Sequence, residues 1–338
     1  MNSIPQNEIN CRPGRCSIPE KAVVMSETHA VQAPSGRLIE TVTALAQLGK
    51  LKLYDIWTGP IVAWSLLVGQ GVPHIRSTML CLLFLIAIGF TVCASHAFDD
   101  ITGFLDGSDI RNYAPERKRS QVKPLVQGTV TVATARVFAY SSVVVASACV
   151  MVFWAVAGFR PWWALVGGLL VTIFGAQYSA GINFSYRIFG GGEALTGITL
   201  AASIWLPFGA AVGEVSAAAL IQGVLFGMWL VQVLICSNTA DAADDHSVGR
   251  RTVAARTSQR TNLAFVVVMF VTSWALAIAG TAFAVLSPWT PLGLLPAWLM
   301  QFYVLRNGLH GYWRNRRNYG FLALRVAVLG LVVVNVFS

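Results

Sequence analysis

The feature that most constrains the fold of this chain is a series of apolar runs, several of them close to 20 residues long. The run from Met79 to Ala94 contains no charged residue. A helix needs about 20 apolar residues to cross a bilayer, and it satisfies its own backbone hydrogen bonds there. The runs lack the period-two alternation that the strands of a membrane barrel would show. The sequence therefore predicts an all-α integral membrane protein.

The composition agrees with this fold class. Of the 338 residues, 55% are hydrophobic and 12% are charged, whereas a soluble domain carries about 25% charged residues. We assign the net charge of +9 to basic cytoplasmic loops, so no nucleic-acid partner is expected. Four cysteines fall in apolar runs, where they are ordinary packing residues. Cys11 and Cys16 have no matching second pair, so neither a disulfide framework nor a metal site is predicted there.

Hydropathy divides the chain into a tail and a membrane domain. Residues 1–36 are polar and are expected to form a disordered cytoplasmic tail, and residues 37–338 form the membrane domain. Residues 38–54 are mildly amphipathic and are predicted to form an interfacial helix. The nine predicted membrane helices span residues 55–72, 78–98, 132–156, 161–180, 193–213, 217–237, 262–286, 290–307 and 320–337.

The positions of the basic residues predict the orientation. The links after the second, fourth, sixth and eighth predicted helices are longer and basic, and the other links are short and poor in charge. The positive-inside rule then places the N-terminus and these four links in the cytoplasm, with the C-terminus outside. We expect a multi-pass protein of the plasma membrane.

Acidic residues gather in two clusters on the predicted cytoplasmic side. In the first cluster, His96 and Asp100 are four residues apart and share one helix face. Asp106 lies beyond these two residues, where Gly103 and Gly107 permit the helix to break into a loop. In the second cluster, three residues spaced three and four apart share a face: Asn238, Asp241 and Asp245. Three further acids point away from these faces and are expected to be outer or solvated groups: Asp99, Asp109 and Asp244.

Carboxylates that share a face at the bilayer surface repel one another unless a cation joins them. Mg²⁺ takes oxygen ligands, commonly one or two carboxylates together with phosphate oxygens and water. Two such helices facing each other predict a site for Mg²⁺ and a diphosphate, with nearby Lys and Arg side chains on the remaining phosphate oxygens. The alternative is that these acids are solvated or cap helices. Two clusters at mirrored positions disfavour it, as does the functional role usual for ionisable residues in membrane segments.

From about residue 50 to the C-terminus, the chain resembles the UbiA superfamily of intramembrane prenyltransferases. His96, Asp100 and Asp106 occupy the positions of the family's first motif, in the spacing of the branch that prenylates 1,4-dihydroxy-2-naphthoate. The segment Lys123-Pro-Leu-Val-Gln-Gly128 resembles the Arg-Pro-Leu-x-x-Gly motif, with Lys in place of Arg. The second acidic motif is matched by Asn238, Asp241, Asp245 and Gly249-Arg-Arg-Thr252, and a fourth motif by Tyr186-Arg187 and Gly190 to Glu193.

The resemblance implies a nine-helix bundle with a central cavity open to the cytoplasm. It also implies Mg²⁺-dependent transfer of a prenyl group from an allylic prenyl diphosphate to a small-molecule acceptor, expected to be an aromatic or quinone-precursor ring. The expected catalytic residues are His96, Asp100, Asp106, Asn238, Asp241 and Asp245. The expected Mg²⁺ ligands are Asp100, Asp106, Asp241 and Asp245. The expected diphosphate-binding residues are Arg119, Lys123, Arg187, Arg250 and Arg251. The expected prenyl-cavity residues are Tyr178, Tyr186 and Trp57, with Trp64, Phe174 and Trp205 as further aromatic candidates.

Two positions depart from the family pattern. His96 stands where Asn is usual, and because imidazole nitrogen suits Mg²⁺ poorly, it is expected to bind the diphosphate or an acceptor hydroxyl. The first helix starts with Lys50-Leu-Lys52 rather than the Arg-Pro of aromatic-prenylating members, which weakens the case for a hydroxybenzoate or naphthoate acceptor. Asp55 is a base, an acceptor anchor or an N-cap of the first helix, and the N-cap is favoured.

Two alternative functions remain. The first is a terpene cyclase of the same fold, in which the substrate's own double bond attacks the cation. The second is a transporter, because acids and bases in a helix bundle also mark ion paths. The acids here gather on one side rather than along a path, which disfavours the transporter.

Overall fold

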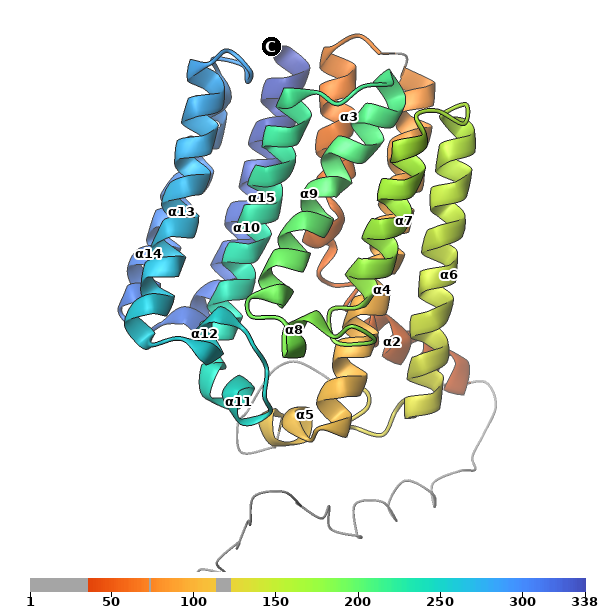
Figure 1. Cartoon of the computed structure of the whole chain (residues 1–338), viewed down its shortest axis with the longest axis vertical. Coiled ribbons are helices and arrows are strands. Elements are labelled where there is room, and N and C mark those ends of the chain that lie inside the picture. The colour runs from red at the N-terminus through yellow and green to blue at the C-terminus, as the bar shows by residue number, and fades with distance from the viewer. Residues whose placement is uncertain (1–35, 73, 114–122) are drawn as a thin grey trace, which may run out of the picture.

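The structure is a computed structural model that describes residues 36–72, 74–113 and 123–338. Residues 1–35 of the predicted tail, which include Cys11 and Cys16, and Arg119 lie outside these residues. Within them the chain forms helices and no strand, and the long helices run side by side as a bundle (Figure 1). The all-α prediction is confirmed.

A helix lies in each range that was predicted to cross the membrane. These helices are α3 (Gly59–Gly69), α4 (His74–Leu105), α6 (Val132–Val156), α7 (Trp162–Ala176), α9 (Gly191–Val212), α10 (Ala217–Ala240), α13 (Gln259–Ala282), α14 (Thr290–Leu309) and α15 (Trp313–Phe337). In the part of the chain that the structure describes, six helices are long and apolar enough to cross a bilayer: α4, α6, α9, α10, α13 and α15. By composition the protein is therefore an integral membrane protein.

Short helices connect the long ones. They are α2 (Gly36–Leu48), the 3₁₀ turn η1 (Tyr54–Trp57), α5 (Ser108–Asn112), α8 (Phe184–Arg187), α11 (Ala242–Ser247) and α12 (Val253–Arg256). Helices α5, α8, α11 and α12 gather at one end of the bundle, and the C-terminus lies at the opposite end (Figure 1). The two acidic clusters, which lie in the last turns of α4 and α10 and in the segments just after them, are therefore at the same end, as predicted.

The predicted first membrane helix is divided in two, and Asp55 does not cap it. The 3₁₀ turn η1 precedes α3, whose N-cap is Thr58. Asp55 is buried and accepts two hydrogen bonds from Arg325 on α15, at 2.6 Å from Nε and 3.0 Å from Nη2. A buried carboxylate requires such a partner, and the paired geometry is the strong arrangement for arginine. The favoured N-cap interpretation was wrong because the partner is 270 residues away in sequence.

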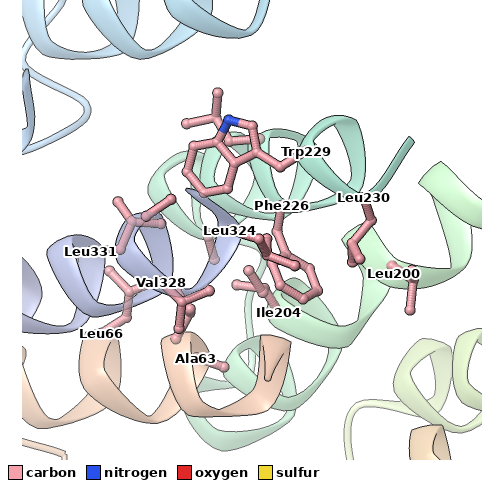
Figure 2. Close-up of a cluster of buried hydrophobic side chains, with 14 of the residues drawn as sticks. Ala63, Leu66, Leu200, Ile204, Phe226, Trp229, Leu230, Leu324, Val328 and Leu331 are labelled. Carbon is pink, nitrogen blue, oxygen red and sulfur yellow. The ribbon is translucent and has the colours of Figure 1, made fainter. Parts of the chain in front are cut away.

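Small residues bring α9 and α10 into close contact. A side-chain carbon at Gly223 would lie 2.6 Å from the carbonyl oxygen of Ala201, and one at Gly227 would meet the carbonyl oxygen of Gly197. Membrane helices use small residues in this way to bring their backbones together. Next to this contact, Phe226 and Trp229 of α10 pack against α3, α9 and α15 in a buried apolar cluster (Figure 2).

A buried polar network also joins three of these helices. Asn335 and Gln222 exchange two side-chain hydrogen bonds of 2.8 and 2.9 Å, and Asn335 donates a third to Ser65 Oγ at 3.0 Å. Polar groups in a membrane interior need partners of this kind, and they fix how the helices face one another. The network and the apolar cluster together fix α3, α10 and α15 around the cavity described next.

Candidate functional site

A cavity of about 260 Å³ lies among η1, α4, α7, α9, α10 and α15. Its deep part is lined by apolar side chains: Leu53, Ile56, Val92, Leu200, Leu230, Val233 and Phe321. Its other part lies at the end of the bundle that carries the acidic clusters, and its charged lining residues are Lys50, Asp99, Asp109, Lys123, Asp241, Asp245, Arg250 and Arg317. One cavity thus joins an apolar interior to a highly charged rim.

Lys123 organises the first acidic cluster. Its ammonium nitrogen lies 2.6 Å from Asp100 Oδ1 and 3.0 Å from Asp109 Oδ2, and the side chain is only 7% exposed. Burial acts to lower the pKa of Lys123, but the charges of Asp100 and Asp109 outweigh burial and raise it. Burial also raises the pKa of Asp109. Lys123 therefore stays charged and presents a fixed positive group to the cavity.

The loop after α4 forms at Gly107 rather than at Gly103. Helix α4 continues through Gly103 to Leu105, and Gly107 has a positive φ of 76°. A side-chain carbon at Gly103 would lie 2.8 Å from the Asp109 carboxyl group. Gly103 thus leaves the space into which α5 folds Asp109 back toward Lys123.

The expectation that Asp99 and Asp109 are outer groups was wrong. Both line the cavity, whereas Asp100 is 2% exposed and points to Lys123 at its edge. Asp99 Oδ1 accepts hydrogen bonds from Arg250 Nη2 at 2.7 Å and from Ser179 Oγ at 2.8 Å. Helical spacing shows which residues share a face, but not which face meets a cavity. Viewed down helix α4, Asp99 and Asp100, which are three and four positions after His96, project to opposite sides of the direction in which His96 points.

The second cluster is positioned by Glu193 of α9, a residue matched to the family's Gly-x-Gly-Glu motif. The Asn238 amide nitrogen donates to Glu193 Oε1 at 2.8 Å, and the backbone N–H of Val253 donates to the same oxygen at 3.1 Å. Because its nitrogen is held by Glu193, Asn238 has its amide oxygen available to the cavity, which it lines with Asp241 and Asp245. Burial raises the pKa of Asp245 to about 7.

Arg250 joins the two clusters. Its Nη2 binds Asp99 of the first cluster, and its Nε lies 3.8 Å from Asp245 of the second. Nε also donates to the Tyr186 hydroxyl at 3.1 Å, and that hydroxyl donates to Asp106 Oδ2 at 2.6 Å. Burial acts to lower the pKa of Arg250, but the charge of Asp99 raises it above the usual range. The structure thus brings together the two motifs, whose first residues, His96 and Asn238, are 142 positions apart in the sequence.

Several predicted site residues lie outside the cavity lining. Asp106 lies at the edge of the cavity, where its carboxylate accepts a hydrogen bond from the Tyr186 hydroxyl. Arg251 donates a hydrogen bond to the backbone oxygen of Arg187. Of the predicted prenyl-cavity residues, Tyr178 lines the cavity, whereas Tyr186 and Trp57 do not. The three further aromatic candidates are also elsewhere: Trp64 donates to Thr78, Phe174 packs on Phe184 and Trp205 packs on Trp163.

Two cations of the cavity, Lys50 and Arg317, were not predicted as site residues. Arg317 lies in a run of arginines that the positive-inside rule already explains. Lys50 follows the amphipathic helix, where a basic residue is ordinary. In each case the sequence offered a sufficient local reason for the charge and no sign of the cavity.

The oxygen-rich side chains suit Mg²⁺, but they do not form a complete cage. Across residues 36–72, 74–113 and 123–338, no three His, Cys, Asp or Glu side chains are close enough to hold a metal ion. Mg²⁺ usually takes one or two carboxylates and completes its shell with substrate phosphates and water. The donors at the rim, Asp99, Asp109, Asp241, Asp245 and Asn238, fit a site of that kind.

Comparisons with known proteins agree with this geometry. The sequence profile described as the UbiA prenyltransferase family matches residues 58–325. No curated protein matches the chain.

A UbiA homolog from Aeropyrum pernix K1 has a similar structure, with TM-score 0.62 and 19% identity over 82% of this chain and 97% of that chain. A UbiA homolog from Archaeoglobus fulgidus bound to DMAPP and Mg²⁺ gives TM-score 0.54 and 15% identity over 83% of this chain and 99% of that one. A structure described for digeranylgeranylglyceryl phosphate synthase in membranes gives TM-score 0.59 and 14% identity over 88% of this chain and 99% of that chain. At these identities the solved structures show a shared fold.

Proposed function

The chain belongs to the UbiA prenyltransferase family, since the family profile matches residues 58–325, and we propose on this premise that it transfers a prenyl group from an allylic prenyl diphosphate to a small-molecule acceptor. The acceptor is an aromatic or quinone-precursor ring, and diphosphate is released. Mg²⁺ is the metal. The Archaeoglobus fulgidus homologs bound to DMAPP or GPP together with Mg²⁺ support this choice.

The observation that carries the proposal is the contact of Arg250 with both acidic clusters at the rim of an apolar cavity. The clusters hold Arg250 and Lys123 in place through Asp99, Asp100 and Asp109, and Asp100 also pairs with Lys50. A diphosphate at the rim would accept hydrogen bonds from both cations. Its prenyl chain would then extend into the deep part of the cavity, among Leu200, Leu230 and Phe321.

The reaction follows from these positions. The bond between the allylic carbon and the diphosphate oxygen breaks, and its electron pair leaves with the diphosphate, whose charge Lys123 and Arg250 neutralise. Bound Mg²⁺ would add Lewis-acid stabilisation of the same leaving group. The ring face of Tyr178 stabilises the allylic cation, and the apolar lining keeps water from it. The acceptor carbon then forms the new bond and loses a proton.

The proposal includes an orientation in the membrane. All nine long helices, including the shorter α3, α7 and α14, cross the plasma membrane. The rim of the cavity and the N-terminus face the cytoplasm. The basic links at the same end as the acidic clusters support this orientation.

Product analysis tests the reaction type. Purified protein is incubated with Mg²⁺ and farnesyl, geranylgeranyl or longer diphosphates, with and without phenolic acceptors, and the products are identified by mass spectrometry. The proposal predicts a prenylated acceptor and free diphosphate. Formation of a cyclic hydrocarbon in the absence of an acceptor would contradict prenyl transfer and show that the protein is a cyclase.

A further inference from the structure

A second cavity lies at the end of the bundle opposite the acidic clusters. It is a groove of about 720 Å³ between the start of α4, the α6–α7 link and the end of α9, at the end that carries the C-terminus (Figure 1). This volume is within the range of clefts that bind ligands. The lining combines two arginines, Arg76 and Arg160, with aromatic and small apolar side chains.

The charge of this groove is unusual for its position. In the described chain, the links and the adjoining helix turns at this end contain two Lys or Arg residues, Arg76 and Arg160, and both line the groove. The positive-inside rule disfavours basic residues at the end opposite the basic links. A single arginine near a bilayer surface simply extends its charged group into water, but this does not explain why the two arginines meet in one groove.

The two arginines are positioned by different means. Arg76 Nη2 donates a hydrogen bond to the backbone oxygen of Ala157 at 2.8 Å, at the C-terminal end of α6. A guanidinium has five N–H donors, so most of them remain for an anion. Arg160 follows Gly158 and Phe159, whose φ angles are 80° and 60°. For a residue as bulky as Phe this conformation is strained, and strained backbone gathers where ligands are held.

Aromatic rings form the sides of the groove. Trp163 packs on Trp205 with ring centroids 6.1 Å apart, and it lies over Gly209, where a side-chain carbon would meet its ring. Phe159 and Trp162 are 61% and 70% exposed. Exposed aromatic rings at the end of a membrane helix are typical of the headgroup level of a bilayer. The end of α9 adds small apolar side chains: Ala210, Ala211 and Val212.

The arginines of the groove lack an anionic partner within the protein. Among the residues that the structure describes, neither Arg76 nor Arg160 forms an ion pair, and none of the side chains lining the groove is acidic. Paired guanidinium groups suit the oxygens of a phosphate. A headgroup that also carried an ammonium would find no carboxylate to balance it. The groove is therefore complementary to a phosphate group with a net negative charge.

We propose that this groove binds an anionic glycerophospholipid from the leaflet at that end of the protein. Arg76 and Arg160 bind its phosphate, the rings of Phe159 and Trp162 lie at the headgroup level, and an acyl chain follows the small residues of α9. The bound lipid contacts α4, α7, α9 and the link after α6. The site is separate from the prenyl diphosphate cavity and does not depend on the proposed reaction.

Lipid retention measured by native mass spectrometry tests the site. The full-length protein is transferred into neutral detergent micelles that contain equal amounts of dioleoyl phosphatidylglycerol and dioleoyl phosphatidylcholine, and the lipids that remain bound are identified. We expect phosphatidylglycerol to be retained at least about tenfold more than phosphatidylcholine, the ratio for one charge-assisted hydrogen bond. Equal retention of the two lipids, or retention of neither, would overturn the proposal.

Arg160→Gln and Arg136→Gln form a matched pair of variants. Arg136 is an exposed arginine near the start of α6, at the other end of the bundle, and it lines neither cavity. Arg160 is changed rather than Arg76 because Arg76 also binds the end of α6. Arg160→Gln should remove the preference for phosphatidylglycerol, and Arg136→Gln should preserve it. Equal losses in the two variants would show a general attraction to charge and overturn the groove as the site.

Inorganic phosphate distinguishes a lipid site from a site for a free anion. Lipid-free wild-type protein is heated in detergent with millimolar phosphate or with dioleoyl phosphatidylglycerol. The proposal predicts that the lipid raises Tm and that phosphate at the same concentration does not, because the free ion lacks the acyl chain that fills the groove. An equal rise with phosphate that disappears in Arg160→Gln would assign the groove to a soluble anion instead.

Discussion

Lys123 is enclosed between Asp100 and Asp109, where water reaches none of the three charges easily. Removing its ammonium group would leave two carboxylates unpaired. Lys123→Met should therefore lower the free energy of unfolding by about 3–5 kcal/mol, the cost of leaving a buried charge without its partner. Thermal unfolding in detergent measures the loss. Lys123→Arg keeps the charge and should unfold close to wild type, and equal destabilisation by both variants would contradict the pairing.

Glu193 positions Asn238 through one hydrogen bond and Val253 through another. Glu193→Ala removes the single oxygen that accepts both hydrogen bonds, and the Asn238 amide is then free to turn its nitrogen toward the cavity. We expect the Mg²⁺ concentration for half-maximal activity to rise about tenfold. Glu193→Gln keeps one acceptor oxygen in place and should recover most of the wild-type response. A fall in activity with an unchanged Mg²⁺ dependence would show a structural role alone.

The chemical types at the site could be predicted from the sequence, but not which of them face the cavity. The spacing of His96 and Asp100 defined a helix face, but the cavity is lined by His96 and Asp99 and not by Asp100. The contacts that decide this are long-range: Asp99 binds Arg250, 151 residues away. For the same reason, the role of Asp55 was misjudged and Arg317 was missed as a cavity residue, since the sequence offered a plausible local role for each.

At the scale of elements, the cavity depends on how closely α9 and α10 approach. Gly227 lies against the backbone of Gly197, so Gly227→Val would force the two helices apart. We expect a loss of about 2–4 kcal/mol in stability, with loss of activity, because both helices line the cavity. Gly197→Ala is the control, because its new carbon would lie 3.3 Å from a side-chain atom of Val231 that is able to move. Equal effects of the two changes would show that the close approach is unimportant.

The presence of the long helices could be predicted from the sequence, because an apolar run of this length has few ways other than a helix to satisfy its backbone hydrogen bonds in a membrane. The predicted ranges and the observed helices differ mainly at their ends. The exception is the division of the first helix into η1 and α3, where Pro60 lacks an N–H and stands at the start of α3. That division places Lys50, Leu53 and Ile56 on the cavity wall, which no periodicity in residues 38–72 indicates.

For the whole molecule, the proposed orientation places α11 in the cytoplasm and the α9–α10 link outside. Ser247 and Glu214 are exposed residues at these two ends. In intact cells, a membrane-impermeant maleimide should label Glu214→Cys and leave Ser247→Cys unlabelled until the membrane is permeabilised. The unsubstituted protein gives the background from its native cysteines. The reverse labelling pattern would invert the topology and place the cavity rim outside.

The central claim is that the two acidic clusters and Arg250 form one site that ionises a prenyl diphosphate. Mg²⁺-dependent release of diphosphate, measured in a single turnover with purified protein and an acceptor, tests it most directly. We predict release by the wild type, a fall of at least about a hundredfold in Asp99→Asn and in Asp245→Asn, and wild-type rates in Arg136→Gln. Normal release by the two aspartate variants, or none by folded wild-type protein from any prenyl diphosphate, would contradict the claim.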